Sequence, residues 1–167
     1  MAQEISKRRL NRLLELNKKL ADENDFSKRI KLISDTIKDI LKVERFTLFM
    51  HDKSGKSMWS VYIDGISYIE IPENEGLVGK AYKTKKVYIL NDLKGDKNYN
   101  LIDEGSRYKT KSVLVMPIIG YDDDVLGVIE LINKTDGTQG FSQEDEKILN
   151  YVLGHISAYL EVMVQEK

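Results

Sequence analysis

Apolar residues recur at steps of three and four in three stretches of the chain, which is the period of an amphipathic helix. The first stretch, residues 3–22, has a leucine stripe that consists of Leu10, Leu13, Leu14, Leu16 and Leu20. Polar residues at 22–25 end this stripe and can cap a second helix, predicted over residues 26–42. The third stretch predicts a C-terminal helix from Ser142 to position 163, with Asp145 at capping-box spacing from Ser142.

Between these helices the apolar pattern changes to short runs of strand-type residues separated by turns. Strands are predicted at residues 44–50, 57–63, 67–71, 87–90, 112–119 and 125–132. A short helix is predicted at 77–83, and we expect the long polar segment 91–107 to act as a lid. Hairpin-linked strands favour an α+β fold with a six-stranded antiparallel sheet. The N- and C-terminal helices cover one face of this sheet, and the short helix and the lid cover a ligand pocket on the other.

The first helix also fits a heptad seam through Leu10, Leu13, Asn17 and Leu20. On this interpretation residues 1–24 form a signalling and dimerisation helix, and residues 25–164 form the folded domain of a homodimer that associates through its N- and C-terminal helices. The alternative is that the first helix packs on its own domain. Helical segments at both ends favour a fragment of a longer signalling chain.

Composition narrows the function classes. The net charge of −1 gives no basic surface of the kind that binds nucleic acid. The absence of cysteine excludes disulfides, thiolate metal sites and cysteine catalysis. No apolar run approaches the roughly 20 residues of a membrane span, and the first residues lack the apolar core of a signal peptide, so we expect a cytoplasmic protein. No spacing typical of a catalytic triad, a phosphate loop or a metal site occurs, so we expect no enzyme activity and no metal.

Polar residues near the end of the chain form a spaced motif: Asn133-Lys134, Phe141 and Asp145-Glu146. We expect Lys134 and Asp145 to form a salt bridge between the last strand and the last helix. The motif resembles the NKFDE signature of GAF domains of the cyclic-nucleotide-binding type, found in phosphodiesterases and adenylyl cyclases. Residues 76–79 resemble the family's GIAG, and residues 103–110 resemble its D-D-x-T-G-x-x-T run, with Ser106 in place of the threonine and Arg107 in place of the glycine.

The resemblance implies a ligand-binding pocket on the face of the short helix. Its residues would be Thr47, Ile63, Asp64, Leu77, Val78, Asp103, Ser106, Thr110 and Glu130. The amides that open the short helix suit a cyclic phosphate of single charge, and hydroxyl groups can bond ribose and phosphate. No arginine stands among these positions to pair with the guanine carbonyl, so cyclic AMP is favoured over cyclic GMP. No other cofactor is expected.

The function implied is that of a regulatory sensor that controls a fused effector, for which a diguanylate cyclase is the first choice. A histidine kinase or a phosphodiesterase is the alternative effector. A rival hypothesis is a ligand-free dimerisation and relay module, and a third is haem-based gas sensing. His155 is expected to be an ordinary surface or interface histidine and no haem ligand. We also expect His51 to be exposed and Trp59 to pack in the core or on the sheet.

Overall fold

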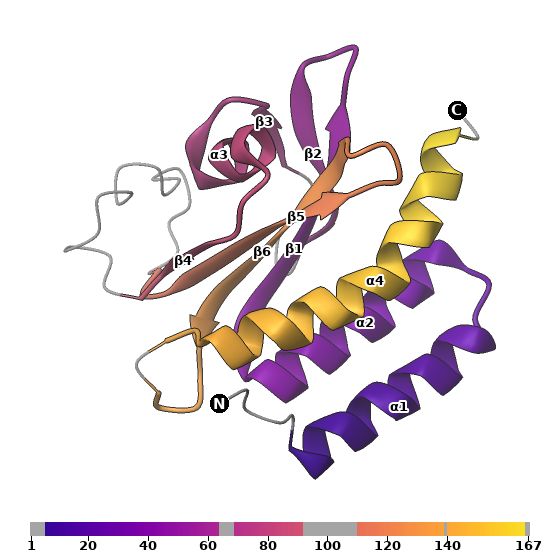
Figure 1. The fold of residues 1–167 in the computed structure, drawn as a ribbon, viewed down its shortest axis with the longest axis vertical. Coiled ribbons are helices and arrows are strands. Elements are labelled where there is room, and N and C mark those ends of the chain that lie inside the picture. Colours follow the sequence, from indigo (N-terminus) through magenta and orange to yellow (C-terminus); the bar gives the residue numbers. More distant parts are fainter. Residues whose placement is uncertain (1–5, 64–68, 92–109, 139, 166–167) are drawn as a thin grey trace.

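The computed structural model describes residues 6–63, 69–91, 110–138 and 140–165. In these ranges the chain forms an α+β fold, which confirms the predicted class (Figure 1). The elements in chain order are α1 (Lys7–Ala21), α2 (Phe26–Leu41), β1 (Val43–Asp52), β2 (Ser57–Ile63), β3 (Glu70–Pro72), α3 (Gly76–Thr84), β4 (Tyr88–Leu90), β5 (Val113–Ile119), β6 (Val125–Lys134) and α4 (Gln143–Gln165).

The strands of the described ranges form one antiparallel sheet in the order β3-β2-β1-β6-β5-β4. β1 and β6, which are the longest strands, lie side by side at its centre. Helices α1, α2 and α4 lie on one side of the sheet and α3 lies on the other (Figure 1). This is the predicted arrangement of the helices. Most of the predicted lid, residues 91–107, lies outside the described residues.

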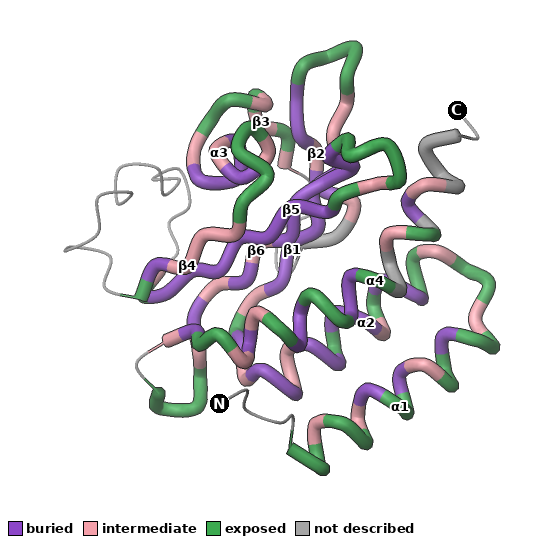
Figure 2. Tube along the Cα trace, viewed as in Figure 1, coloured by how far each residue is buried: buried purple, intermediate pink, exposed green. Residues whose placement is uncertain are grey.

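The larger apolar core lies between the sheet and α2 and α4, and it extends to α1. The stripe predicted for α2 is buried at Ile30, Ile33, Ile37, Ile40 and Leu41. The inner face of α1 adds Leu13, Leu16 and Leu20 (Figure 2). Burying a leucine side chain contributes roughly 1.5–3 kcal/mol, so α1 is packed on the domain by its own leucines.

The heptad seam predicted along α1 is wrong in the residues that it places at a dimer contact. It placed Leu10, Leu13, Asn17 and Leu20 on one contact surface, but Leu13 and Leu20 are buried within the chain's own core. Leu10 and Leu14 are the exposed leucines of α1. The inner leucines of α1 are buried against α2, because α2 presents a row of isoleucines to them. The proposed division at residues 1–24 and 25–164 stays a prediction.

A second apolar cluster lies on the opposite side of the sheet, under α3. It combines Leu77, Val78 and Ala81 of α3 with inward side chains of the strands, among them Phe49, Val113, Val115 and Val128. α3 is therefore anchored on the sheet by apolar side chains along one face of the helix. No helix in the described part of the chain has the length and the apolar composition that crossing a membrane requires.

The packing of α1 can be tested with two leucines of the same helix. Leu16 is 2 % exposed and Leu14 is 48 % exposed. Leu16→Ala should lower the free energy of unfolding by about 2–5 kcal/mol, because it opens a cavity in the core. Leu14→Ala should change it by about 0.5 kcal/mol or less. Urea unfolding measures both, and equal effects of the two variants would show that α1 does not pack as described.

Candidate functional site

A row of paired residues crosses the sheet on the side that faces α3. Directly opposed residues of antiparallel strands point to the same face. Thr47 of β1 pairs with Ile63 of β2 and with Glu130 of β6, and Glu130 pairs in turn with Val115 of β5. Val115 belongs to the cluster under α3. The sheet register therefore places Thr47, Glu130 and position 63 in one row on the predicted ligand face.

Thr47 is buried and Glu130 is half-buried in this row. A carboxylate in the middle of a strand, among apolar neighbours, is costly unless it has polar partners. Glu130 therefore marks this row as the polar part of an otherwise apolar face. Of Ile63, only the backbone position is described.

Arg45 lies on the same face and was missed in the sequence. It stands two residues before Thr47 on β1 and pairs with Ile132, which pairs with Val113 of the cluster under α3. Its row is therefore next to that of Thr47 and Glu130. Diagonal neighbours in a sheet are within reach of long side chains. Residues two apart on a strand point to the same face, so alternation from Thr47 could have identified Arg45 in the sequence. The register was needed to show which face of the sheet the two residues share.

The first turn of α3 adds main-chain donors to this face. Leu77 and Val78 are buried against the sheet. The N-cap residue, Glu75, makes no side-chain capping hydrogen bond, and Gly76 has a φ of +68°, a conformation that favours glycine. The opening amides of a helix are groups without intrahelical acceptors, and they suit an anion. The helix also lies close to the preceding turn, since a Cβ at Gly79 would come within 2.7 Å of the Asn74 backbone.

The remaining predicted ligand residues are only partly placed. Thr110 is half-buried and directly precedes the stretch that enters β5. Asp64, Asp103 and Ser106 lie outside the described residues, so their positions in the site stay predictions. The structure brings Thr47, Glu130, Leu77 and Val78 to the same side of the sheet.

The predicted salt bridge between Lys134 and Asp145 is present and buried. Lys134 Nζ lies 3.1 Å from Asp145 Oδ2, and both side chains are 3 % exposed. The ammonium group also donates to the carbonyl of Leu41 at the end of α2 and lies 3.6 Å from Asp136. It stands 5.8 Å from the ring centre of Phe141. These partners compensate the loss of hydration that a buried charge suffers.

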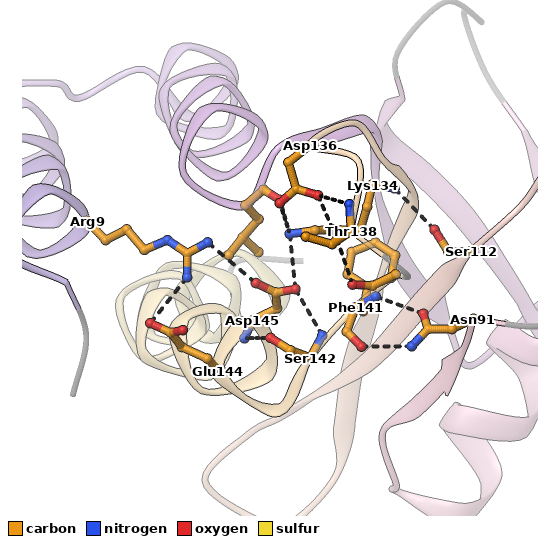
Figure 3. Close-up of polar contacts among 12 residues, drawn as sticks. Arg9, Asn91, Ser112, Lys134, Asp136, Thr138, Phe141, Ser142, Glu144 and Asp145 are labelled. Carbon is orange, nitrogen blue, oxygen red and sulfur yellow. Dashed lines mark hydrogen bonds and ion pairs between the residues drawn. The ribbon is translucent and has the colours of Figure 1, made fainter. Parts of the chain in front are cut away.

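Asp145 joins this ion pair to the start of α4 and to α1 (Figure 3). Its carboxylate accepts a hydrogen bond from the Ser142 amide at 3.0 Å, and its own amide donates to Ser142 Oγ at 3.2 Å, which confirms the predicted cap. Arg9 of α1 lies 3.2 Å from Glu144 and 3.9 Å from Asp145. One buried carboxylate thus connects β6, the start of α4 and α1.

Asn133 and Phe141 hold the two chain positions that flank residues 92–110. Asn133 Oδ1 accepts hydrogen bonds from the amides of Lys111 (2.6 Å) and Ser112 (3.1 Å). The Asn91 side chain makes two hydrogen bonds of 2.8 Å with the backbone of Phe141 (Figure 3). Glu146, the last residue of the motif, is half-buried, and its amide donates to the Ser142 carbonyl. These contacts of the motif are with protein groups.

The expectation that His51 is exposed is wrong. Its side chain is 5 % exposed, and Nε2 lies 2.8 Å from Glu73 Oε2. Its ring stacks on Tyr82 of α3, with 4.3 Å between ring centroids. Burial and the negative charge of Glu73 raise the pKa of Tyr82. Trp59, in contrast, packs against the helix-side core as expected, and the side chain of His155 is not described.

Hydrogen bonds and a neighbouring positive charge favour the ionised state of Asp136, which lies beside the buried ion pair. Burial alone would raise the pKa of this carboxyl, but hydrogen bonds from Thr138 and the charge of Lys134 hold the pKa below its usual value. The Thr138 hydroxyl donates to Asp136 Oδ1 at 2.6 Å. Asp136 therefore gives the Lys134 ammonium group a second negatively charged partner at the end of β6.

The contribution of the buried pair can be measured against an exposed one. Lys134→Met should lower the free energy of unfolding by about 3–5 kcal/mol, since it leaves a buried carboxylate without its main partner. Lys53 pairs with Asp124 at 3.4 Å on the surface, so Lys53→Met should cost no more than about 1 kcal/mol. Chemical denaturation compares the two. A loss for Lys134→Met as small as that for Lys53→Met would contradict the structural role of the pair.

Comparisons with known proteins agree with this fold. The family model for the GAF domain matches residues 25–160. The cGMP-specific 3',5'-cyclic phosphodiesterases of Drosophila melanogaster and Drosophila virilis are each 36 % identical over 86 residues, which are 51 % of this chain and 8 % and 10 % of those proteins. This chain therefore spans no more than about a tenth of the length of these relatives.

Solved structures show the same fold at low sequence identity. The GAF domain from Acinetobacter phosphoenolpyruvate-protein phosphotransferase superposes with a TM-score of 0.79 at 17 % identity, covering 94 % of this chain and 95 % of that one. The free methionine-R-sulfoxide reductase from Neisseria meningitidis gives 0.76 at 15 %, covering 100 % and 98 %. Since the family model matches well over half of the sequence and the architecture agrees, this chain belongs to the GAF domain family.

Proposed function

We propose that this GAF domain is a regulatory module that binds a cyclic nucleotide on the α3 side of its sheet. The observation that carries the proposal is the pairing of Thr47 with Glu130 on the face that α3 covers. This brings a hydroxyl and a carboxylate to the side of the sheet where a helix begins. The partial similarity to cGMP-specific phosphodiesterases supports the same class of ligand.

The phosphate would bind at the first turn of α3. A cyclic phosphate carries one negative charge, and the amides and positive dipole end of a helix suit a single charge. The Glu75 side chain does not compete for these amides by capping them. Buried Leu77 and Val78 fix this turn on the sheet, so its amides are held in place before the ligand arrives.

The base would bind over the row that contains Thr47 and Glu130. A carboxylate accepts hydrogen bonds from the amino group of adenine or from N1–H and N2–H of guanine, so Glu130 alone does not choose between them. The expected preference for cyclic AMP depended on the absence of an arginine near the site. Arg45 on the same face removes that ground, because a guanidinium can donate to O6 and N7 of guanine. Cyclic AMP and cyclic GMP are therefore both tested below.

Binding would be passed on through the helices to a fused effector, for which a diguanylate cyclase remains our first choice. The contacts of Arg9 and Lys134 with Asp145 support this route, because they connect α1 and α4 to the end of β6. Asn91 and Asn133 tie the positions flanking residues 92–110 to the same region. A change at the end of β6 therefore has polar contacts through which to reach both helices.

A second candidate function is a dimerisation and relay module that needs no ligand. The outer face of α1 favours it, since Leu10 and Leu14 lie one helical turn apart and are 44 % and 48 % exposed. Residues four apart on a helix are neighbours on its surface. We propose that this apolar pair contacts the same pair of a second copy in a homodimer, which is compatible with either function.

Nucleotide binding can be tested by calorimetric titration of refolded, nucleotide-free protein with cyclic AMP and cyclic GMP. We expect saturable binding, and at 100 times the dissociation constant the ligand should stabilise the fold by about 2.7 kcal/mol. Arg45→Ala should weaken cyclic GMP more than cyclic AMP, by about 1–3 kcal/mol, if the guanidinium contacts the guanine edge. Lys53→Ala, on an exposed turn, is the matched control. Absence of binding of either nucleotide to the unmodified protein would favour the relay module.

The dimer can be tested by sedimentation velocity with two charge-matched changes. The double variant Leu10→Glu and Leu14→Glu should dissociate a dimer, because it places carboxylates in the apolar contact. Lys19→Glu changes the net charge equally on an exposed position of the same helix and should leave the dimer intact. Unaltered circular dichroism controls for folding. A dimer that persists in the double variant would rule out this face of α1.

A further inference from the structure

A second polar contact on the α3 side of the sheet involves His51. His51 lies near the end of β1 and contacts both α3 and the turn that precedes it. Its Nε2 is 2.8 Å from Glu73 in the turn that leads into the helix, and its ring stacks on Tyr82 near the helix end, with 28° between the ring planes. The NKFDE-like motif does not include these residues, which link β1 to α3 and to the turn before it.

The turn that carries Glu73 is joined tightly to the first turn of α3. The Glu73 amide donates to the carbonyl of Lys56 at 3.0 Å, and the Glu75 amide donates to the carbonyl of Pro72 at 3.1 Å. Gly79 packs so closely on the backbone of residues 73 and 74 that a Cβ there would meet the Glu73 carbonyl oxygen at 2.9 Å. A displacement of Glu73 would therefore displace the start of α3 with it.

The other contacts of α3 with the sheet are apolar along the helix face, and at the helix end the Thr84 and Tyr88 hydroxyl oxygens lie 2.9 Å apart. Leu77, Val78 and Ala81 hold the helix by apolar burial, which is non-directional. A hydrogen bond constrains both distance and angle. His51 therefore adds a directional side-chain contact between the strand that carries Thr47 and the turn that opens α3, beside the backbone bond from Glu73 to Lys56.

We propose that His51 is a positioning residue for the nucleotide site. Through Glu73 it sets the separation between the α3 amides, which take the phosphate, and Thr47 on the same strand, which faces the base. This inference rests on the function proposed above. A site whose two halves are held apart at the right distance binds with a smaller loss of conformational freedom than one that must first be ordered.

Three variants and one control test the proposal. His51→Phe keeps an aromatic ring to stack on Tyr82 and removes the bond to Glu73. Glu73→Ala removes the partner, whereas Glu73→Gln keeps a side-chain oxygen that can accept from Nε2. Lys53→Ala changes an exposed residue on the adjacent turn. Each protein is titrated with cyclic AMP and cyclic GMP, and hydrogen–deuterium exchange is followed in the peptide that contains residues 76–84.

We expect His51→Phe and Glu73→Ala to weaken nucleotide binding about tenfold and to speed exchange in residues 76–84, while exchange in α4 stays unchanged. Glu73→Gln and Lys53→Ala should match the unmodified protein in both measurements. The proposal is overturned if Glu73→Gln loses as much affinity as Glu73→Ala, or if His51→Phe and Glu73→Ala leave both affinity and exchange unchanged.

The exchange measurement separates this proposal from the proposed function. If the unmodified protein binds neither nucleotide, the ligand assignment fails. Faster exchange of residues 76–84 in His51→Phe and Glu73→Ala would then still show that His51 fixes α3. Unchanged exchange in that case would overturn the positioning role as well.

Discussion

The buried ion pair between Lys134 and Asp145 is the contact on which the arrangement of the helices around the sheet depends. Each charge has lost most of its hydration, so each needs several polar partners. Lys134 finds them at the end of α2 and in Asp136, and Asp145 finds them in the cap of α4 and in Arg9. Satisfying two buried charges thus fixes the relative positions of α1, α2, β6 and α4.

The same region also holds the chain positions that flank residues 92–110. Asn133, which precedes Lys134, accepts a hydrogen bond from the Lys111 amide, and the Phe141 backbone bonds the side chain of Asn91. The helix face of the sheet is a packed core that contains the buried ion pair, and the α3 face is an apolar layer crossed by a polar row. The buried bonds at the end of β6 hold the helix side of the sheet to the chain positions that flank residues 92–110.

The sequence predicted the features that depend on near neighbours and failed at those that depend on distant ones. Helix periodicity and capping placed α2 and α4, and the motif spacing predicted the bond between Lys134 and Asp145. The surroundings of His51 could not be predicted, because its partner Glu73 stands 22 residues away. The face of Arg45 needed the register of β1 with β6, and the inward side of α1 was set by the isoleucines of α2. In each of these cases the arrangement depends on contacts between residues that are distant in sequence.

The central claim is that the anion affinity of this domain comes from the main-chain amides that open α3, above the row of Thr47 and Glu130. The most direct measurement is a titration of isotope-labelled protein with cyclic nucleotide, followed by the amide resonances of Gly76, Leu77 and Val78. The account predicts large, saturable shifts at these amides and smaller shifts at the end of α4. Saturable binding that leaves these amides unmoved would contradict it.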